Sequence, residues 1–225
     1  MNVFPFEECR GRLEITEGYG DDNVILSDGP FESLPRLTFR RHGPLARPIE
    51  GCRFQVHSTA TGAIAIFAAF SNAEVEIGAH TRLTTDLRLW SDAVVRIGDH
   101  TTINRARLVA DNSEILIGPD CMFSDDILVQ SSDQHGLIDI ESGDFINSHR
   151  RSIVIGEHVW IGRRSVLMPD SAIGDGSVLG TGSILTKVVA KEVGDMGIRC
   201  NCVVPGAIRT DLMVNYVKRV ADEKG

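Results

Sequence analysis

The stretch IGEHVWIGRRSVLMPDSAIGDGSVLGTGSILTK, residues 155 to 187, carries a large aliphatic side chain at every sixth position. A period of six fits neither the 3.6-residue turn of an amphipathic helix nor the simple alternation of a β-meander. It fits short strands joined by turns, so we expect each repeat to form one strand. The repeated positions are Ile155, Ile161, Leu167, Ile173, Leu179 and Leu185.

The same period occurs earlier in the chain, in three sets that begin twenty residues apart. If three strands complete one coil, each inward side chain stacks on its equivalent about 4.8 Å further along the axis. The alternative, a β-sandwich with chance spacing, is disfavoured because so many positions keep the phase. The sets are Ile77, Leu83, Leu89 and Val95; Ile97, Ile103, Val109 and Ile115; and Ile117, Phe123 and Val129.

Glycine follows many of these positions, as expected where a sharp corner needs unusual backbone angles or a close backbone approach. The sequence therefore predicts a mainly β, coiled architecture whose interior consists of columns of Ile, Leu and Val. The glycines are Gly78, Gly98, Gly118, Gly156, Gly162, Gly174 and Gly180.

The composition describes one sizeable domain of 225 residues with 42% hydrophobic residues. The longest apolar run, Ala63 to Phe70, is too short to span a membrane. The net charge of -8, without a basic block, disfavours nucleic acid as a partner. Five cysteines without a CxxC pair favour reduced thiols. Because Met1 to Arg10 lacks the features of a signal peptide, we expect a cytoplasmic location.

With its [LIV]-G-x-x-x-x repeat, the segment from about residue 50 to residue 187 resembles the hexapeptide-repeat acyltransferases, in particular the sugar and polysaccharide O-acetyltransferases. The resemblance implies a left-handed parallel β-helix, although parallel crossovers are ordinarily right-handed. It also implies a homotrimer with active sites between subunits, and acetyl-CoA as the co-substrate.

Both ends of the chain lack the six-residue phase. We expect an irregular or β-rich N-terminal cap over residues 1–52, the β-helix acyltransferase domain over residues 53–187 with a loop at 130–150, and a helix-strand-helix tail over residues 188–225. Residues 51–70 read as a degenerate first coil, since a terminal repeat contacts another repeat on one side only.

The segment from about residue 185 to residue 213 resembles a C-terminal fragment of the short-chain dehydrogenases, with GIRCNCVV as a strand before a Pro-Gly loop. A dehydrogenase would also need a glycine-rich phosphate loop and a YxxxK pair. The chain has neither. We therefore expect a fused tail that has no oxidoreductase chemistry.

The repeat is interrupted between Val129 and Ile155, which predicts a long excursion from the scaffold, a usual place for function. Within it SSDQHGLID, residues 131–139, resembles the SDxHxIxD segment of the O-acetyltransferase branch. The resemblance makes His135 the general base, because imidazole titrates near neutral pH. Asp133 or Asp139 would orient the ring. The alternative is that His135 is a solvated loop residue.

Trp160 should point outward if Ile161 points inward. The resemblance places this tryptophan beside the reaction cleft, and packing between subunits is the alternative. The residues that the resemblance assigns to coenzyme A are Trp160, Gly162, Gly180, Thr181, Thr186 and Lys187.

Other polar positions allow further interpretations. His80, His100 and His158 each follow an Ile-Gly corner and could ligate zinc, but polar corner residues are expected outside any such coil, so we expect no metal. Arg163 and Arg164 could bind phosphates or pair with acidic groups on a neighbouring subunit, and we favour pairing. Asp125 and Asp126 border either the cleft or solvent, while Trp90 and Phe123 are expected to be packing residues.

The function expected from the sequence is therefore acetyl-CoA-dependent transfer of an acetyl group to a sugar or polysaccharide hydroxyl. Two alternatives remain open. One is a catalytically silent β-helical scaffold, or a chimera with impaired coenzyme A binding. The other is an N-acyltransferase that acts on an amino sugar.

Overall fold

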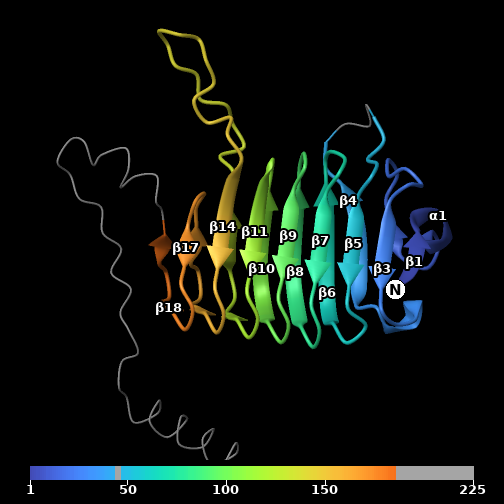
Figure 1. The fold of residues 1–225 in the computed structure, drawn as a ribbon. Coiled ribbons are helices and arrows are strands. Elements are labelled where there is room, and N and C mark those ends of the chain that lie inside the picture. Colours follow the sequence, from blue (N-terminus) through green and yellow to red (C-terminus); the bar gives the residue numbers. More distant parts are fainter. Residues whose placement is uncertain (44–46, 186–225) are drawn as a thin grey trace, which may run out of the picture.

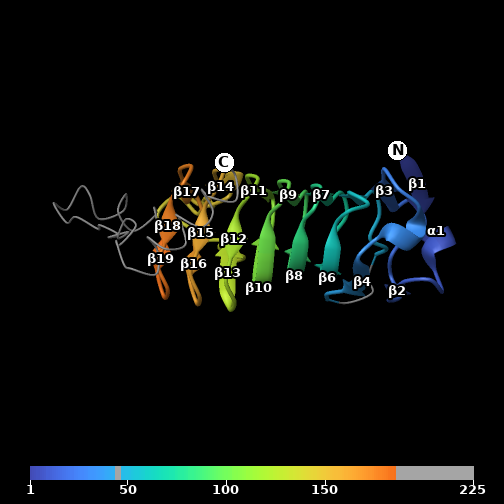
Figure 2. The same cartoon turned by 90° about the horizontal axis from the view of Figure 1, so that it is seen from below.

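The computed structural model describes residues 1–43 and 47–185 as a row of stacked β coils (Figure 1). Successive coils lie side by side along one axis, from the N-terminal end to β18 and β19 (Figures 1 and 2). Neighbouring strands are therefore separated in sequence by a full coil. The predicted parallel β-helix is confirmed.

One face is an eight-stranded sheet whose order follows the chain, β1-β3-β5-β7-β9-β11-β14-β17. All of its pairs are parallel except β1 with β3. Its strands are β1 (Asn2–Pro5), β3 (Val24–Ser27), β5 (Arg53–Val56), β7 (Glu74–Ile77), β9 (Val94–Ile97), β11 (Ser113–Ile117), β14 (Arg151–Ile155) and β17 (Ala172–Ile173).

In the N-terminal coils, the remaining part of each coil is a single strand. In the later coils it is divided into two strands that lie on two different faces. The undivided strands are β2 (Glu14–Ile15), β4 (Arg36–Arg41), β6 (Thr61–Ala68), β8 (Arg82–Leu89) and β10 (Thr102–Ala110). Beyond β10 one face holds β12 (Met122–Phe123), β15 (Trp160–Ile161) and β18 (Val178–Leu179). The other holds β13 (Ile127–Gln130), β16 (Val166–Leu167) and β19 (Ile184–Leu185). Because β10 pairs with both β12 and β13, each later coil is a three-sided prism.

Two of the predicted columns run along the interior. Ile77, Ile97 and Ile117 are direct partners in the parallel register, which continues through Ile155 and Ile173. A second column contains Leu83, Ile103, Phe123, Ile161 and Leu179, all almost fully buried. Phe123 is thus an inward packing residue, as expected.

The third predicted column, through Leu89, Val109 and Val129, is wrong. Val129 stacks on Leu108, which stacks on Leu87, while Leu89 is paired with Ala110. In these coils two six-residue steps merge into one long strand, and β10 holds one extra residue between Ile103 and Ala106. The expectation of one strand for each repeat therefore holds only beyond β10.

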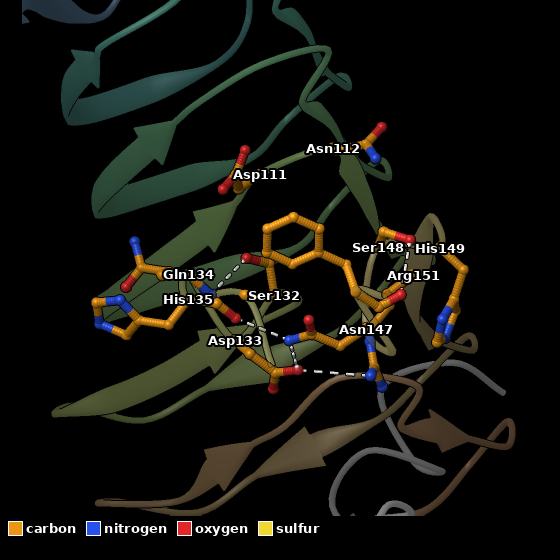
Figure 3. A pocket seen from close by; sticks show the side chains of 12 residues that line it. Asp111, Asn112, Ser132, Asp133, Gln134, His135, Asn147, Ser148, His149 and Arg151 are labelled. Carbon is orange, nitrogen blue, oxygen red and sulfur yellow. Dashed lines mark hydrogen bonds and ion pairs between the residues drawn. The ribbon is translucent and has the colours of Figure 1, made fainter. Parts of the chain in front are cut away.

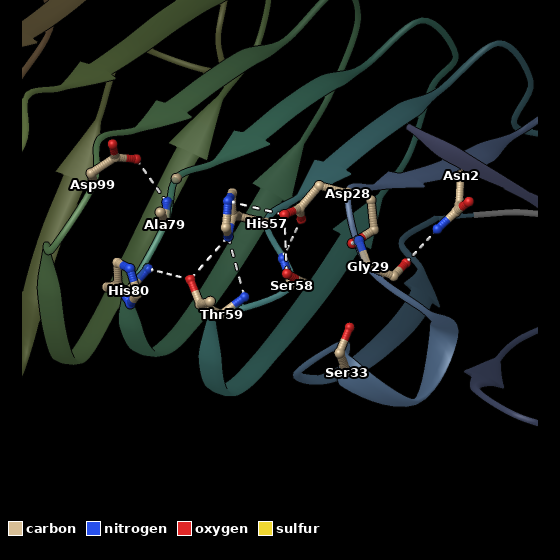
Figure 4. Close-up of polar contacts among 12 residues, drawn as sticks. Asn2, Asp28, Gly29, Ser33, His57, Ser58, Thr59, Ala79, His80 and Asp99 are labelled. Carbon is tan, nitrogen blue, oxygen red and sulfur yellow. Dashed lines mark hydrogen bonds and ion pairs between the residues drawn. The ribbon is translucent and has the colours of Figure 1, made fainter.

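The corners between the eight-stranded sheet and the next face carry the histidines considered as zinc ligands. His80, His100 and His158 adopt left-handed backbone angles, with φ of 54°, 58° and 54°, and are exposed. The rings of His80 and His100 stack at 5.0 Å, as their spacing predicts. Figure 4 shows this corner, where His57 also pairs with Asp28 at 3.1 Å.

The first 52 residues add strands to both sheets, since β3 and β4 already pair in parallel with β5 and β6. The short helices α1 (Phe6–Cys9) and η1 (Phe31–Ser33) lie at this end. The ring of Phe6 packs on Phe39 at 4.7 Å and on Phe54 at 5.8 Å, which fills the N-terminal end of the interior. The division of the chain at residue 52 stays a prediction, and the predicted 188–225 tail lies outside the described residues.

Candidate active site

The chain leaves the β-helix after β13 and returns at β14, and residues 131–150 form a hairpin that projects from one corner (Figure 1). Ile138 and Phe145 form an antiparallel bridge, and the N–H of Ile146 donates to the Leu137 carbonyl at 2.9 Å. Gly136 lies beneath the Phe145 ring, where an added Cβ would be 2.4 Å from a ring carbon. The segment that carries His135 thus has a defined internal structure.

A cavity of ≈ 270 Å³ lies where this hairpin meets the β-helix (Figure 3). It contains two histidines, His135 and His149, together with acidic and amide side chains. The lining residues are Asp111, Asn112, Ser132, Asp133, Gln134, His135, Gly136, Phe145, Asn147, Ser148, His149 and Arg151.

Arg151 holds the base of the hairpin. Its side chain is only 11% exposed, and the guanidinium lies 3.4 Å from Asp133 Oδ2 and 2.9 Å from Asp170 Oδ2. Asn147 Nδ2 donates to Asp133 Oδ2 at 3.1 Å and to the His135 carbonyl at 2.8 Å. Asp133 therefore links both strands of the hairpin to the β-helix. Sequence reasoning missed Arg151, which begins β14, and Asn147.

The His135 ring points away from the carboxylate of Asp133 (Figure 3). Among residues 1–43 and 47–185, no hydrogen bond or ion pair reaches this ring. Asp139 instead accepts the backbone N–H groups of Glu141 and Ser142 at 2.9 and 2.8 Å, and these bonds lower its pKa. A single chain thus brings neither carboxylate to His135, and their role in orienting the ring stays a prediction.

Asp111 is a further acidic residue of the cavity that sequence reasoning missed. Burial raises the pKa of its carboxyl, against the lowering effect of a hydrogen bond from the Ser91 backbone. A perturbed carboxyl in a cavity with two histidines is typical of a functional site. The sequence offered one signal for this residue, since Asp111 directly follows the inward residue Ala110, one coil before the hairpin.

Trp160 faces outward as predicted, with 43% of its surface exposed, while Ile161 is fully buried. Its register partners on neighbouring coils are Met122 and Val178, so the outer face of β12, β15 and β18 bears an apolar strip. The indole Nε1 lies 3.5 Å from Ser124 Oγ. The exposed strip suits either an apolar part of a substrate or a neighbouring subunit.

Gly162, Gly180 and Thr181 lie at the next corner, between β15 and β16 and between β18 and β19. An added Cβ on Gly162 would be 2.5 Å from the Thr181 nitrogen, so the coils approach closely here. Ser165 Oγ donates to the carbonyls of Gly162 and Gly180 and ties the two turns together. Thr186 and Lys187 lie outside the described residues.

The arginines near this corner are engaged within the chain. Arg163 Nε lies 3.0 Å from Asp125 Oδ2, and its Nη2 lies 3.6 Å from Asp126 Oδ2. Arg105 also pairs with Asp126. These pairs lie within one chain, with Asp125 and Asp126, so pairing of Arg163 with a neighbouring subunit stays a prediction.

His135 and Trp160 belong to opposite parts of the prism. The hairpin leaves at the corner between the β13–β16 face and the eight-stranded sheet, whereas Trp160 lies on the face across from that corner. One chain therefore does not place both residues in one cleft. A site that uses both needs a second chain.

Comparison with known proteins agrees with the fold. Residues 152–187 match the family "Bacterial transferase hexapeptide (six repeats)". The chain is 33% identical over 81 residues to a polysialic acid O-acetyltransferase of Neisseria meningitidis, covering 36% of this chain and 37% of that protein. It is 45% identical over 51 residues to a galactoside O-acetyltransferase of Escherichia coli K12, covering 23% and 25%.

Among solved structures, the crystal structure of the polySia-specific acetyltransferase NeuO aligns with a TM-score of 0.54 and 26% identity, covering 74% of this chain and 79% of that chain. By fold, the described part of the chain is a parallel β-helix, and its residues 152–187 match the hexapeptide repeats of bacterial transferases. The aligned segments span only about a third or less of the curated relatives described above. The dehydrogenase-like segment lies almost wholly outside the described residues and stays a prediction.

Proposed function

We propose that this chain transfers an acetyl group from acetyl-CoA to a hydroxyl of a sugar or polysaccharide, with His135 as general base. The observation that carries the proposal is the placement of His135. It lies on an ordered hairpin, in a cavity beside the β-helix, and the hairpin is anchored by Asp133 and Arg151. The relatives named O-acetyltransferases support the same class of reaction.

An imidazole can promote this acetyl transfer as a general base, and no covalent enzyme intermediate is needed. The acceptor hydroxyl gives its proton to His135 as its oxygen attacks the thioester carbonyl carbon, and the carbon–sulfur bond breaks. The imidazolium then returns the proton to the departing sulfur. A pKa near neutrality suits both transfers. General base catalysis of this kind contributes about 10²–10⁴-fold in rate.

The residues expected to hold acetyl-CoA fit an extended, partly apolar molecule. Trp160 and Met122 offer exposed apolar surface beside the corner that contains Gly162 and Gly180. That corner contains small residues because consecutive coils approach closely. The role of Thr181 in lining coenzyme A, and the roles of Thr186 and Lys187 near its phosphates, are part of the same proposal.

The active site is proposed to lie between subunits of a homotrimer, because His135 and Trp160 are on opposite parts of one prism. The hairpin also exposes large apolar side chains, which a neighbouring subunit would cover. These side chains are Leu137, Ile138, Ile140, Phe145 and Ile146, with Ile140 98% exposed.

The proposal includes a cytoplasmic location. Cys9, Cys52 and Cys121 are free thiols, as expected in a reducing compartment. No helix within the described part of the chain is long and apolar enough to cross a membrane.

Thiol release from acetyl-CoA in the presence of sialic acid oligomers and galactosides tests the reaction. The matched variants are His135→Ala and His149→Ala, since both histidines line the cavity. We expect His135→Ala to lower kcat at least about 100-fold and His149→Ala to lower it less than about threefold.

Equal rates for the wild type and His135→Ala would contradict the role of His135, and a rate of zero for both would favour the silent scaffold or chimera. Mild alkaline treatment of the product before mass spectrometry separates transfer to oxygen from transfer to nitrogen when amino sugars are added to the panel, because an ester loses its acetyl group and an amide keeps it. An acetamide product alone would favour the N-acyltransferase.

A further inference from the structure

A second cleft lies on the same edge of the β-helix as the His135 cavity, towards the N-terminal end. Its volume is ≈ 860 Å³, within the range of small-molecule sites. Its walls come from the chain after β4, β6 and β8, at the same corner of three successive coils. Six of the lining residues are Arg41, His42, Arg47, Phe70, Trp90 and Asp92.

The cleft combines aromatic surface with hydrogen-bonding groups. Phe70 is 55% exposed, and Trp90 is half-buried, with its ring centroid 5.5 Å from that of His42 in an edge-to-face arrangement. Trp90 thus packs on His42, in line with the packing role expected from the sequence, and it also lines the cleft. Arg47 is exposed and makes no ion pair with any described residue, while Asp92 is an exposed acid nearby.

Backbone contacts connect this cleft to the His135 cavity. The N–H of Trp90 donates to the Ala110 carbonyl at 2.8 Å, and the N–H of Asn112 donates to the Ser91 carbonyl at 2.6 Å. Asn112 lines the His135 cavity, and Ser91 lines the second cleft. Arg150, at the end of the hairpin, donates to the Asp92 carbonyl at 3.1 Å. The two cavities thus follow one another along one corner.

The distance between them follows from the coil geometry. The Trp90 turn and the start of the hairpin at Ser131 are two coils apart, which is about 10 Å along the axis. A monosaccharide in the His135 cavity would leave the second cleft empty. An oligosaccharide chain running along the corner would reach both.

We propose that this cleft binds sugar units of an oligosaccharide acceptor at a distance from the acetylated unit. Phe70 and Trp90 would cover the apolar faces of the sugar rings, while Asp92 would accept hydroxyl hydrogen bonds and Arg47 would donate to hydroxyl or carboxylate oxygens. The identity of the acceptor rests on the proposed function, but binding of an oligosaccharide to this cleft can be measured without turnover.

Binding is measured by tryptophan fluorescence in a His135→Ala, Trp160→Phe background. The chain has two tryptophans, so Trp90 is then the only one. The two probes are a sialic acid oligomer, which is carboxylated, and a galacto-oligosaccharide, which is neutral. We expect a saturable change in Trp90 emission with at least one probe and a much weaker response to the corresponding monosaccharide.

Adding Phe70→Ala should raise the dissociation constant of the bound oligosaccharide about tenfold. Val3→Ala is the matched control, since Val3 is exposed to the same extent, at 56%, on β1. Adding Arg47→Glu distinguishes the ligands, because it should weaken binding of the carboxylated oligomer and leave the neutral one unchanged.

An unchanged Trp90 emission with both probes would overturn the subsite, whether or not the wild type acetylates a sugar. The subsite would also be overturned if Phe70→Ala changes the oligomeric state and leaves the dissociation constant of the oligosaccharide unaltered. The cleft would then be a contact between copies of the chain. Binding without thiol release by the wild type would support the subsite and count against the proposed reaction.

Discussion

At the scale of single residues, the hairpin depends on groups that the sequence pattern did not single out. The SSDQHGLID resemblance located His135 and Asp133, both of which line one cavity. It could not show that Asp133 pairs with Arg151, because that contact depends on where the chain re-enters the β-helix. Periodicity locates inward side chains well, but it carries little information about contacts in a segment that leaves the repeat.

Arg151 should be needed to anchor the hairpin. Arg151→Met leaves Asp133 and Asp170 without their common partner, and we expect it to lower the free energy of unfolding by about 1–3 kcal/mol. Denaturant unfolding measures the loss. The neighbouring Arg150, 41% exposed and 3.8 Å from Glu114, is the control, and Arg150→Met should cost less than about 0.5 kcal/mol. Equal losses for the two variants would contradict the anchoring role.

Asp111 should make the fold less stable as the pH rises through its titration. Burial raises the pKa of this carboxyl, so ionisation costs more in the folded chain than in the unfolded chain. Asp111→Asn should therefore raise Tm at pH 7, and the gain should disappear below about pH 4, where the carboxyl is protonated in both states. Thermal unfolding across this pH range measures the effect. A pH-independent difference in Tm would exclude the titration of Asp111 as its cause.

At the scale of elements, the sequence predicted the buried faces more accurately than it predicted the ends of the strands. The columns through Ile77 and Leu83 are as expected, because a six-residue step returns the chain to the interior at each corner. The column through Val109 is wrong, because β8 and β10 run straight through a predicted corner and β10 has an irregular register. A period alone does not distinguish two short strands from one long strand.

The glycines after the Ile positions of the eight-stranded sheet should differ in importance along the stack. An added Cβ on Gly98 would lie 2.5 Å from the Pro119 nitrogen, whereas at Gly174 the nearest described atom is 4.0 Å away. We expect Gly98→Ala to lower the free energy of unfolding by about 1–3 kcal/mol and Gly174→Ala to change it by less than about 0.5 kcal/mol. Urea titrations measure both changes in the free energy of unfolding, and a similar loss at the two positions would contradict the packing argument.

At the scale of the whole molecule, the β-helix separates residues that the resemblance places in one site. His135 belongs to the hairpin that leaves one corner, and Trp160 lies on the face opposite that corner. A straight prism cannot bring them together by a local movement. The exposed apolar side chains of the hairpin and of the Trp160 face both suit contact with another copy of the chain.

Complementation between two defective chains tests this account most directly. His135→Ala and Trp160→Ala chains are co-expressed, purified as mixed oligomers and assayed for thiol release from acetyl-CoA with the preferred acceptor. If each site takes His135 from one subunit and Trp160 from its neighbour, random trimers regain about a quarter of the wild-type sites. The account predicts activity near that level, well above either variant alone. An activity equal to the mean of the two separate variants would contradict it.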